Sequence, residues 1–318
     1  MFFGWGGSNY PENVETHLAV QGIFSVDQKR LWSNEKVPIP QKKGDKWMRR
    51  LSKLSVVPIL AFTLILGACG SDEPTNDSSG DGEAKEKLRI VTDGAYAPME
   101  YMDGGEVVGF GIDFTKAVVE EAGYEAEIDV IGWDPIFAEI EGETADLAVS
   151  SITINDERKE TYDFSVPYYL STNQILVPED SDIQSGDDLK GKKIAVLNGS
   201  TGQEAAERIA GENSRDVLKF GDNNLAIQEL LSGGAEAVIA DNTIVEYYTQ
   251  MNPEQNLKAV SDESFEDEFY GILFPKGSEL KGDFDDAIKA ILDNGKYAEI
   301  YEEWFGTEPD IETLKAQQ

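Results

Sequence analysis

From residue 87 onward, short apolar runs typical of strands alternate with segments whose apolar residues recur at helical spacing. Residues 88–92 and 146–149 are such runs, whereas residues 114–122 carry apolar side chains three and four positions apart. Strands that alternate with helices pair mostly in parallel and have the helices on the faces of the sheet, so the alternation predicts an α/β fold with mostly parallel sheets. The roughly 230 residues of this segment suffice for one large domain or two lobes.

The regular segments recur in both halves of this stretch and are bounded by Gly, Pro, Asn or Asp residues. We expect strands over residues 88–92, 127–131, 146–149, 193–197, 237–240 and 269–274, and a hairpin over 101–108. We expect helices over residues 114–122, 133–140, 203–210, 223–231, 243–250 and 281–294, and a shorter one after Gly295.

A second feature precedes the α/β segment. Residues 56–66 are apolar, follow three basic residues within 49–53, and end at the sequence Leu-Gly-Ala-Cys. A basic region, a short apolar core and small residues before a cleavage point are typical of a secretory signal. Eleven residues are too few to span a bilayer, which needs about 20 in a helix. The segment resembles the lipobox of bacterial lipoproteins, which implies cleavage before Cys69, lipid on its thiol and export; an uncleaved anchor or a buried core helix is the alternative.

The position of this signal divides the N-terminal part of the chain. Secretory signals begin at the N-terminus, so we expect Met48 to be the native start and residues 48–68 to be the signal peptide. Residues 1–47 show no clear period and are expected to be a non-native or disordered upstream extension. Residues 69–86 are polar and are expected to be a flexible tether.

The charge of the chain restricts its partners. Of the 27 Lys and Arg and the 61 Asp and Glu residues, nine basic and five acidic ones precede Cys69, which leaves 18 basic and 56 acidic residues after it. The exported part thus has a formal charge of −38, compared with −34 for the whole chain. This field repels nucleic acid and anionic lipid, so neither is an expected partner. Most of the carboxylates are expected to form a solvated surface.

The scarcity of reactive side chains restricts the chemistry. Cys69 is the only cysteine, so no internal disulfide forms, and His17, the only histidine, lies before the signal. The exported part therefore lacks the residues for Ser-His-Asp, Cys-His or His-based zinc chemistry. Carboxylate-based catalysis remains open, but we expect a protein that is not an enzyme and that uses no metal or other cofactor.

An ordered set of motifs over residues 88–306 resembles the polar amino-acid receptors of ABC importers, which belong to the periplasmic-binding-protein superfamily (type II). Each motif alone is weak, but their order is specific. The motifs are residues 92–101 (TDGAYAPMEY), 108–113 (VGFGID), 132–134 (GWD), 146–158, 163–169 (DFSVPYY), 189–193 (LKGKK) and the C-terminal pair 295–297 (GKY) and 304–306 (WFG).

The resemblance implies two α/β lobes joined by two crossing hinge strands, with a ligand held between the lobes. Lobe 1 would comprise residues 87–173 plus 269–318, and lobe 2 residues 174–268, with crossings near residues 172–175 and 267–271. It also implies a monomer, anchored by lipid at the extracytoplasmic face of the membrane, that delivers its ligand to the permease subunits of an ABC transporter.

The sequence offers a carboxylate site after the strand at 146–149. Ser150, Ser151, Thr153 and Arg158 follow this strand, and ligands of open α/β sheets bind at the carboxyl ends of strands. A carboxylate is best held by a guanidinium fork with N–H or O–H donors. The resemblance assigns the ligand carboxylate to Arg158; without the flanking motif, an exposed surface arginine would be the simpler interpretation.

Lobe 2 contributes three further candidates by resemblance. Thr201 and Gly202 match the loop that meets the same carboxylate, and a helix N-terminus there would add its positive end; an ordinary Gly-rich turn is the alternative. Asp241 ends the strand 237–240 and matches the partner of the ligand ammonium, which needs a carboxylate once desolvated. Alternatively, Asp241 only caps the next helix.

The remaining candidates concern the ligand side chain. By resemblance, Asp93 meets the head of that side chain, while Tyr96 and Trp133 sandwich its stem; core packing is the alternative for the two aromatic residues. Glu100 either adds negative charge or faces solvent. Leu197 stands where glutamine receptors often carry lysine, which favours arginine, lysine or histidine over glutamine, with cystine still open. An enzyme on the same fold, such as a dehydratase of cyclic acids, and a sensory lipoprotein remain as alternative functions.

Overall fold

The computed structural model describes residues 85–318. The expected signal peptide, Cys69, the upstream extension and nearly all of the expected tether lie outside these residues. Within the described range, no helix has the length and apolar character needed to cross a bilayer.

Lobe 1 is the part of the chain built on a five-stranded sheet in the order β5-β1-β6-β14-β7. The pairs β1–β5 and β1–β6 are parallel, whereas β14 is antiparallel to both β6 and β7. A smaller antiparallel sheet, β2-β3-β4, contains the hairpin expected over residues 101–108. The strands of the large sheet are β1 Lys87–Thr92, β5 Glu125–Val130, β6 Leu147–Ala148, β7 Asp163–Phe164 and β14 Leu273–Phe274, and those of the small sheet are β2 Ala95–Tyr96, β3 Glu100–Asp103 and β4 Glu106–Val108.

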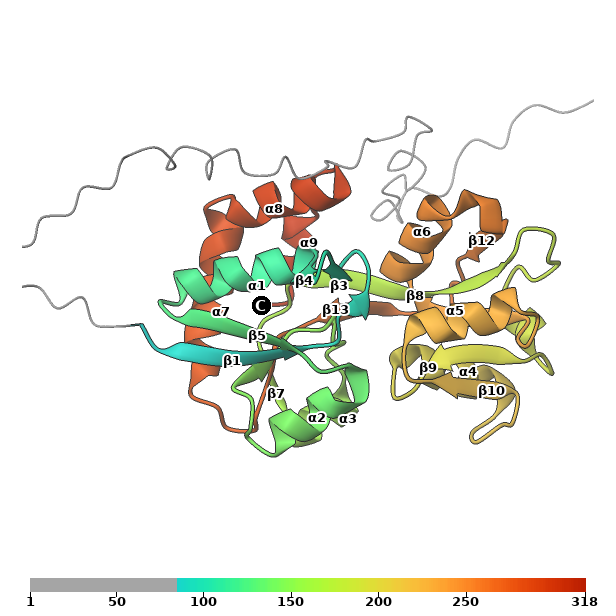
Figure 1. Cartoon of the computed structure of the whole chain (residues 1–318), viewed down its shortest axis with the longest axis horizontal. Coiled ribbons are helices and arrows are strands. Elements are labelled where there is room, and N and C mark those ends of the chain that lie inside the picture. Colours follow the sequence, from blue (N-terminus) through green and yellow to red (C-terminus); the bar gives the residue numbers. More distant parts are fainter. Residues whose placement is uncertain (1–84) are drawn as a thin grey trace, which may run out of the picture. The chain divides into compact units, whose positions relative to one another are not determined.

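Helices cover both faces of the large sheet in lobe 1 (Figure 1). Helix α1 packs against α7 and α8, and α2 contacts β1 and β6. The helices of lobe 1 are α1 Phe110–Glu121, α2 Trp133–Glu141, α3 Asp156–Thr161, α7 Leu280–Asp293, α8 Lys296–Phe305 and α9 Ile311–Lys315.

The expected start of the first helix at residue 114 is wrong, because α1 begins at Phe110. The N–H groups of Phe110 and Gly111 donate to the carbonyls of Pro98 and Met99 at 3.0 and 2.9 Å. The preceding segment thus supplies acceptors for the first N–H groups of the helix, which have none within the helix. Gly109 makes this possible: its φ is +140°, and a Cβ there would lie 1.9 Å from the Met99 carbonyl oxygen.

Lobe 2 is built on a second mixed sheet in the order β10-β9-β11-β8-β12, with β13 also paired to β8. Strands β10, β9 and β11 run parallel, and β8 is antiparallel to β11 and β12. The strands are β8 Tyr169–Pro178, β9 Ile194–Leu197, β10 Val217–Phe220, β11 Ala237–Asp241, β12 Leu257–Val260 and β13 Asp267–Tyr270. The helices are α4 Thr201–Ala210, α5 Asn223–Leu231 and α6 Asn242–Met251, with short 3-10 helices at Gly186–Leu189 and Pro253–Gln255.

Strands β8 and β13 connect the two lobes (Figure 1). They pair antiparallel, with Thr172 opposite Asp267 and Tyr169 opposite Tyr270, before β8 continues into the sheet of lobe 2. The expected single strand over 269–274 is wrong, because β13 ends at Tyr270 and β14 starts at Leu273 in the other sheet. Gly271 lies at this break, where a Cβ would come within 2.8 Å of the Ile154 side chain.

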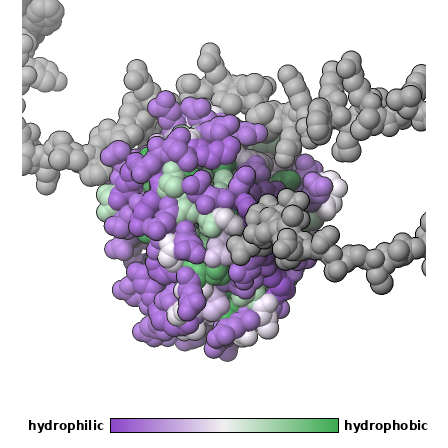
Figure 2. All heavy atoms as spheres, turned by 90° about the vertical axis from the view of Figure 1, so that its left-hand side faces the viewer, coloured by the Kyte–Doolittle hydropathy of each residue, from purple (hydrophilic) through white to green (hydrophobic). Residues whose placement is uncertain are grey.

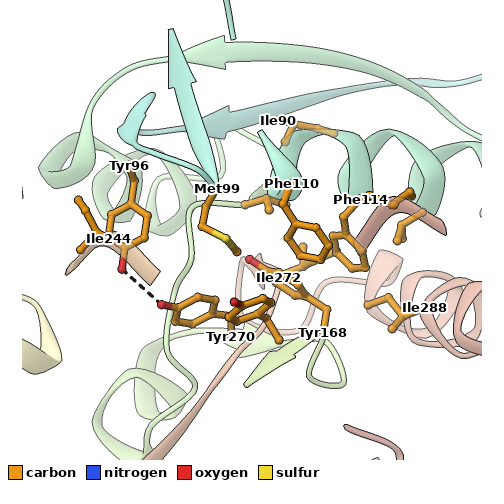
Figure 3. Packing of buried hydrophobic residues seen from close by; sticks show 14 of the residues in the cluster. Ile90, Tyr96, Met99, Phe110, Phe114, Tyr168, Ile244, Tyr270, Ile272 and Ile288 are labelled. Atoms are coloured by element: carbon orange, nitrogen blue, oxygen red, sulfur yellow. Dashed lines mark hydrogen bonds between the residues drawn. The ribbon is translucent and has the colours of Figure 1, made fainter. Parts of the chain in front are cut away.

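The two sheets with helices on their faces confirm the predicted α/β class and two-lobe architecture. The expectation that the sheets are mostly parallel is wrong, because each large sheet is mixed, with antiparallel pairs made by β14 in one and by β8 in the other. An aromatic cluster forms the centre of lobe 1: Phe114 stacks on Tyr168 at 4.3 Å between ring centroids, and Phe110 packs beside them (Figure 3). Hydrophilic side chains cover most of the lobe 1 face shown in Figure 2, in keeping with the acidic composition.

Candidate ligand-binding site

Residues from both lobes line a narrow cavity with about 340 Å³ of space free of protein atoms, part of it open to solvent. Nine predicted site residues line it: Tyr96, Trp133, Ser150, Ser151, Thr153, Arg158, Leu197, Thr201 and Asp241. Ser200, Asn223 and Ala240, which were not predicted, line it as well.

The two other predicted residues, Asp93 and Gly202, lie next to this lining. The Asp93 N–H donates to Ser150 Oγ at 3.0 Å, which ties the end of β1 to the cavity wall. Gly202 is in the first turn of α4, where a Cβ would lie 2.7 Å from the Ile239 carbonyl oxygen. Close packing of α4 on β11 therefore explains this glycine structurally. That these eleven residues bind a ligand remains a prediction.

Arg158 is presented by a short helix with a well-defined start. Asn155 caps α3, because its side-chain oxygen accepts the Arg158 N–H at 2.8 Å. The guanidinium donates to the carbonyls of Thr153 at 2.8 Å and Gly199 at 3.1 Å, and lies 5.7 Å from the centre of the Trp133 ring. Arg158 thus bonds backbone carbonyls in both lobes.

The charge of Arg158 is not neutralised by a carboxylate. Among the described residues, no Asp or Glu oxygen lies within 4 Å of its guanidinium nitrogens. Burial lowers the pKa of Arg158 from its usual value, yet a guanidinium remains charged at neutral pH. A half-buried cation without a counterion is well suited to bind an anion.

The start of α4 faces the same cavity. The helix begins at Thr201, two residues before the expected start, because Ser200 Oγ accepts the Gln203 N–H at 3.1 Å and caps it. Thr201 and Gly202 are therefore first-turn residues, whose N–H groups have no intrahelical acceptors. Such N–H groups and the positive end of the helix favour an anion.

Asp241 lies at the end of β11, as expected, and its carboxylate accepts a hydrogen bond from the Tyr270 hydroxyl. The Tyr270 hydroxyl lies 3.3 Å from that of Tyr96 (Figure 3). Tyr270 in the core of lobe 1 thus contacts Tyr96, which lines the cavity. Burial raises the pKa of Asp241. Asp241 occupies the cap position of α6 but makes no capping hydrogen bond, so the helix-cap interpretation is excluded.

Glu268 is a site residue that the sequence did not reveal. Its carboxylate accepts hydrogen bonds from Thr153 Oγ1 at 2.7 Å, Thr201 Oγ1 at 2.8 Å and Asn173 Nδ2 at 2.5 Å. The nearby negative charge of Asp241 adds to the effect of burial, which raises the pKa of Glu268 to about 7. The sequence did not indicate a role for Glu268 because this residue ends the acidic run 262–268, which resembles a solvated charge cluster.

Two buried carboxyl groups, Asp93 and Glu100, form a second acidic group within lobe 1. Burial raises the pKa of Asp93 to about 6 and that of Glu100 to about 8. Glu100 is fully buried and accepts from Ser151 Oγ at 3.0 Å, so the interpretation that it faces solvent is wrong. Among the described residues, neither carboxyl group forms an ion pair.

Lobe 2 brings Asn223 to the cavity at the start of α5. Asn223 is 4% exposed, and its Oδ1 has no hydrogen-bond partner among the described residues. The preceding Asp222 lies close enough to Asp93 for its charge to raise the pKa of Asp93. In sequence, Asn223 is indistinguishable from an ordinary residue at a helix start.

Direct bonds between the lobes show that the structure is a closed arrangement. Trp133 Nε1 donates to the Asn198 carbonyl at 2.8 Å, and Asn224 Nδ2 donates to the Ala95 carbonyl at 3.2 Å. Together with the Arg158–Gly199 bond, they surround the cavity with contacts from both lobes.

Two lobes on a strand hinge, with a charged cavity between them, define a binding protein that closes around a small polar solute. Residues 88–307 match the family model described as bacterial extracellular solute-binding proteins, family 3, and the chain belongs to this family. Its location is thus extracytoplasmic.

Individual relatives agree with the family. The chain is 33% identical to the arginine-binding extracellular protein ArtP of Bacillus subtilis, over 77% of this chain and 94% of that protein. It is 30% identical to a probable histidine-binding protein of Neisseria gonorrhoeae, over 81% of this chain and 97% of that protein. The crystal structure of the arginine-, lysine-, histidine-binding protein ArtJ from Geobacillus stearothermophilus is similar with a TM-score of 0.71 and 47% identity, over 72% of this chain and 100% of that one.

Proposed function

We propose that this protein captures a free L-amino acid with a cationic side chain for an ABC importer. The observation that carries the proposal is the arrangement of charges: Arg158 and Asp241 line one cavity, and the buried Asp93 lies next to it, without an ion-pair partner for any of the three among the described residues. A cationic amino acid offers one carboxylate and two cationic groups, and buried charges are stable only when paired. The named relatives bind arginine, lysine or histidine, which supports this class.

We assign the roles as follows. Arg158, with the Thr201 hydroxyl and the first N–H groups of α4, would bind the ligand carboxylate, and Asp241 would bind the ammonium. Ser150, Ser151 and Thr153 would complete this wall. Tyr96, Trp133 and Leu197 would contact the side-chain stem, and Asp93 would meet the cationic head. The basic amino acids arginine, lysine and histidine rank first, and glutamine is a close second.

The proposed cycle involves binding and closure without a chemical reaction. The ligand docks on lobe 1, and lobe 2 then adds Thr201, Gly202 and Asp241, so that the closed state gains contacts that the open state lacks. We propose residues 87–173 plus 269–318 and residues 174–268 as the two bodies that rotate about β8 and β13. The closed monomer would then deliver its cargo to the permease.

Membrane attachment is proposed through Cys69. One acyl chain gives only weak, reversible binding, so a multiply acylated Cys69 after removal of residues 48–68 would hold the receptor close to its permease. Globomycin-sensitive processing and mass spectrometry of the mature N-terminus would test this, and an unmodified Cys69 in the cell would contradict it.

Isothermal titration calorimetry of the purified protein with L-arginine, L-lysine, L-histidine, L-glutamine, L-cystine and L-glutamate tests the ligand class. We expect arginine to bind most tightly and glutamate to fail, because its second carboxylate would meet the Asp93 carboxylate. Glutamate binding as tight as that of arginine would contradict the proposal.

A further inference from the structure

Glu268 joins three separate parts of the fold through a single carboxylate. Thr153 follows β6 in lobe 1, Thr201 begins α4 in lobe 2, and Asn173 lies on the hinge strand β8. All three donate to Glu268, at 2.7, 2.8 and 2.5 Å, and Glu268 itself lies on the other hinge strand, β13. No other carboxylate among the described residues accepts bonds from both cavity hydroxyls.

The number of hydroxyl protons limits what this arrangement can bind. A threonine hydroxyl carries one proton, and the hydroxyls of Thr153 and Thr201 both direct that proton to Glu268. Only their lone pairs then remain for the cavity. A ligand carboxylate has no proton to share with those lone pairs, so in this state both hydroxyls repel the very group that Arg158 attracts.

We propose that Glu268 is a positioning residue that takes up one proton from solvent when the ligand carboxylate binds; this inference rests on the proposed function. Once protonated at Oε2, the oxygen that both threonine hydroxyls contact, Glu268 donates its own O–H to Thr201 Oγ1, while Oε1 still accepts from Asn173. The Thr201 hydroxyl then rotates and donates a hydrogen bond to the ligand carboxylate, while Asn173 keeps its bond to Oε1 and Thr153 donates to the hydroxyl oxygen Oε2. The only covalent change is the O–H bond that the solvent proton forms with Glu268.

The charges around Glu268 favour this proton uptake. Asp241 on β11 and Glu204 on α4 face it with negative charge, and Arg158 on α3 faces it with positive charge, while Glu266 and Asp267 flank it in sequence. Burial and Asp241 already raise the pKa of Glu268 to about 7, so a bound carboxylate beside it raises that pKa further. Ligand binding above neutral pH therefore requires a proton.

The test compares wild type, Glu268→Gln and Glu204→Gln by calorimetry with L-arginine in buffers of different ionisation enthalpy. Glutamine is isosteric with protonated glutamate, whereas Glu204 is a matched control near Arg158 that bonds neither hydroxyl. We expect wild type and Glu204→Gln to take up close to one proton more than Glu268→Gln at pH 8. We also expect their affinity to fall relative to that of Glu268→Gln by up to about fivefold from pH 7 to pH 8, because Glu268 is already partly protonated at pH 7 and the titration of Glu100 is common to all three proteins.

The possible results distinguish failure of this inference from failure of the proposed function. Equal proton uptake by wild type and Glu268→Gln overturns the inference, and so does a Glu268→Gln variant that binds more weakly at every pH with the slope unchanged. Failure of every tested amino acid to bind overturns the proposed function as well. Thermal unfolding of each variant verifies its fold.

Discussion

Two clusters of ionisable residues lie in the wall of the cavity or directly behind it, and they differ in which parts of the fold supply their residues. The Arg158 cluster, formed by Arg158, Thr153, Thr201, Asp241 and Glu268, combines residues of both lobes and the hinge, and hydrogen bonds join them across the lobes. The Asp93 cluster, formed by Asp93, Glu100, Ser150 and Ser151, lies within lobe 1. Groups that meet only on closure suit the part common to all α-amino acids, whereas a cluster within one lobe can select the side chain before closure.

The largest effect is expected from Arg158→Ala. This change removes the cation of the first cluster, and the loss of two charge-assisted hydrogen bonds, about 4 kcal/mol, corresponds to roughly a thousandfold weaker binding of every amino acid. Calorimetry would measure it. Arg208→Ala, at an exposed arginine on α4, serves as the control and should bind normally. If Arg158→Ala retained wild-type affinity, the assignment of the carboxylate to this cluster would fail.

The Asp93 cluster should affect the free energy of unfolding even without a ligand. Burial raises the pKa of Glu100 from 4.5 to about 8, so between these values the folded state holds a proton that the unfolded chain has released. Stability therefore falls as the pH rises from about 5 to about 8, by a few kcal/mol for this group. Urea unfolding at pH 5 and pH 8 should show a smaller loss in Glu100→Gln than in wild type.

The control for this measurement is Glu106→Gln, an exposed carboxylate in the same hairpin. It should lose as much stability as wild type over the same pH range. If Glu100→Gln and Glu106→Gln behaved alike, Glu100 would titrate as an exposed group and the Asp93 cluster would lose its buried acid.

Asp93→Asn should separate the two clusters by ligand. Loss of the head-group charge costs about 1.5–3 kcal/mol, so L-arginine should bind roughly ten- to a hundredfold more weakly while L-glutamine changes little. Burial raises the pKa of Asp93 to about 6, so arginine affinity of wild type should also fall as the pH drops below about 6, and Asp93→Asn should lack that fall. Asp103→Asn, in the exposed hairpin turn, is the control. An equal loss for both ligands would show that Asp93 is not the selector.

The smallest effect concerns closure alone. Trp133→Phe keeps an aromatic face but removes the indole N–H that bonds the Asn198 carbonyl of lobe 2. A neutral hydrogen bond contributes about 1 kcal/mol, so all ligands should bind about fivefold more weakly. Trp304→Phe removes an indole N–H that bonds the Asp113 carboxylate outside the cavity lining, and should leave affinity unchanged. Identical affinities for the two variants would mean that the Trp133–Asn198 contact does not stabilise the closed state.

Patterns along the chain predicted the class of fold and most of the residues that line the cavity. This was possible because short runs of neighbouring residues mark the strand ends and turns on which those residues lie. They did not predict β8, whose ten residues mix apolar and polar side chains since it pairs with β13 in one part and with β11 and β12 in another. Glu268 and Asn223 were missed for a related reason. Their roles come from strand register and lobe contact, which no local pattern records.

Glu100 illustrates a different limit. Its sequence context left burial and exposure equally open, and the decision comes from Gly111, where a Cβ would lie 2.2 Å from the Glu100 carboxylate. A glycine on a neighbouring helix thus makes room for a buried acid, which only the packing of α1 against β3 reveals.

The close contact between Gly202 and the Ile239 carbonyl has a consequence for engineering this receptor as a biosensor. No residue larger than glycine fits at position 202 without moving α4. Directed evolution can therefore change few residues in the part of the cavity that would bind the carboxylate of the amino acid. Libraries that randomise Asp93, Asn223 and Leu197 instead can change the detected analyte while the closing motion, and hence an attached fluorescent reporter, is preserved.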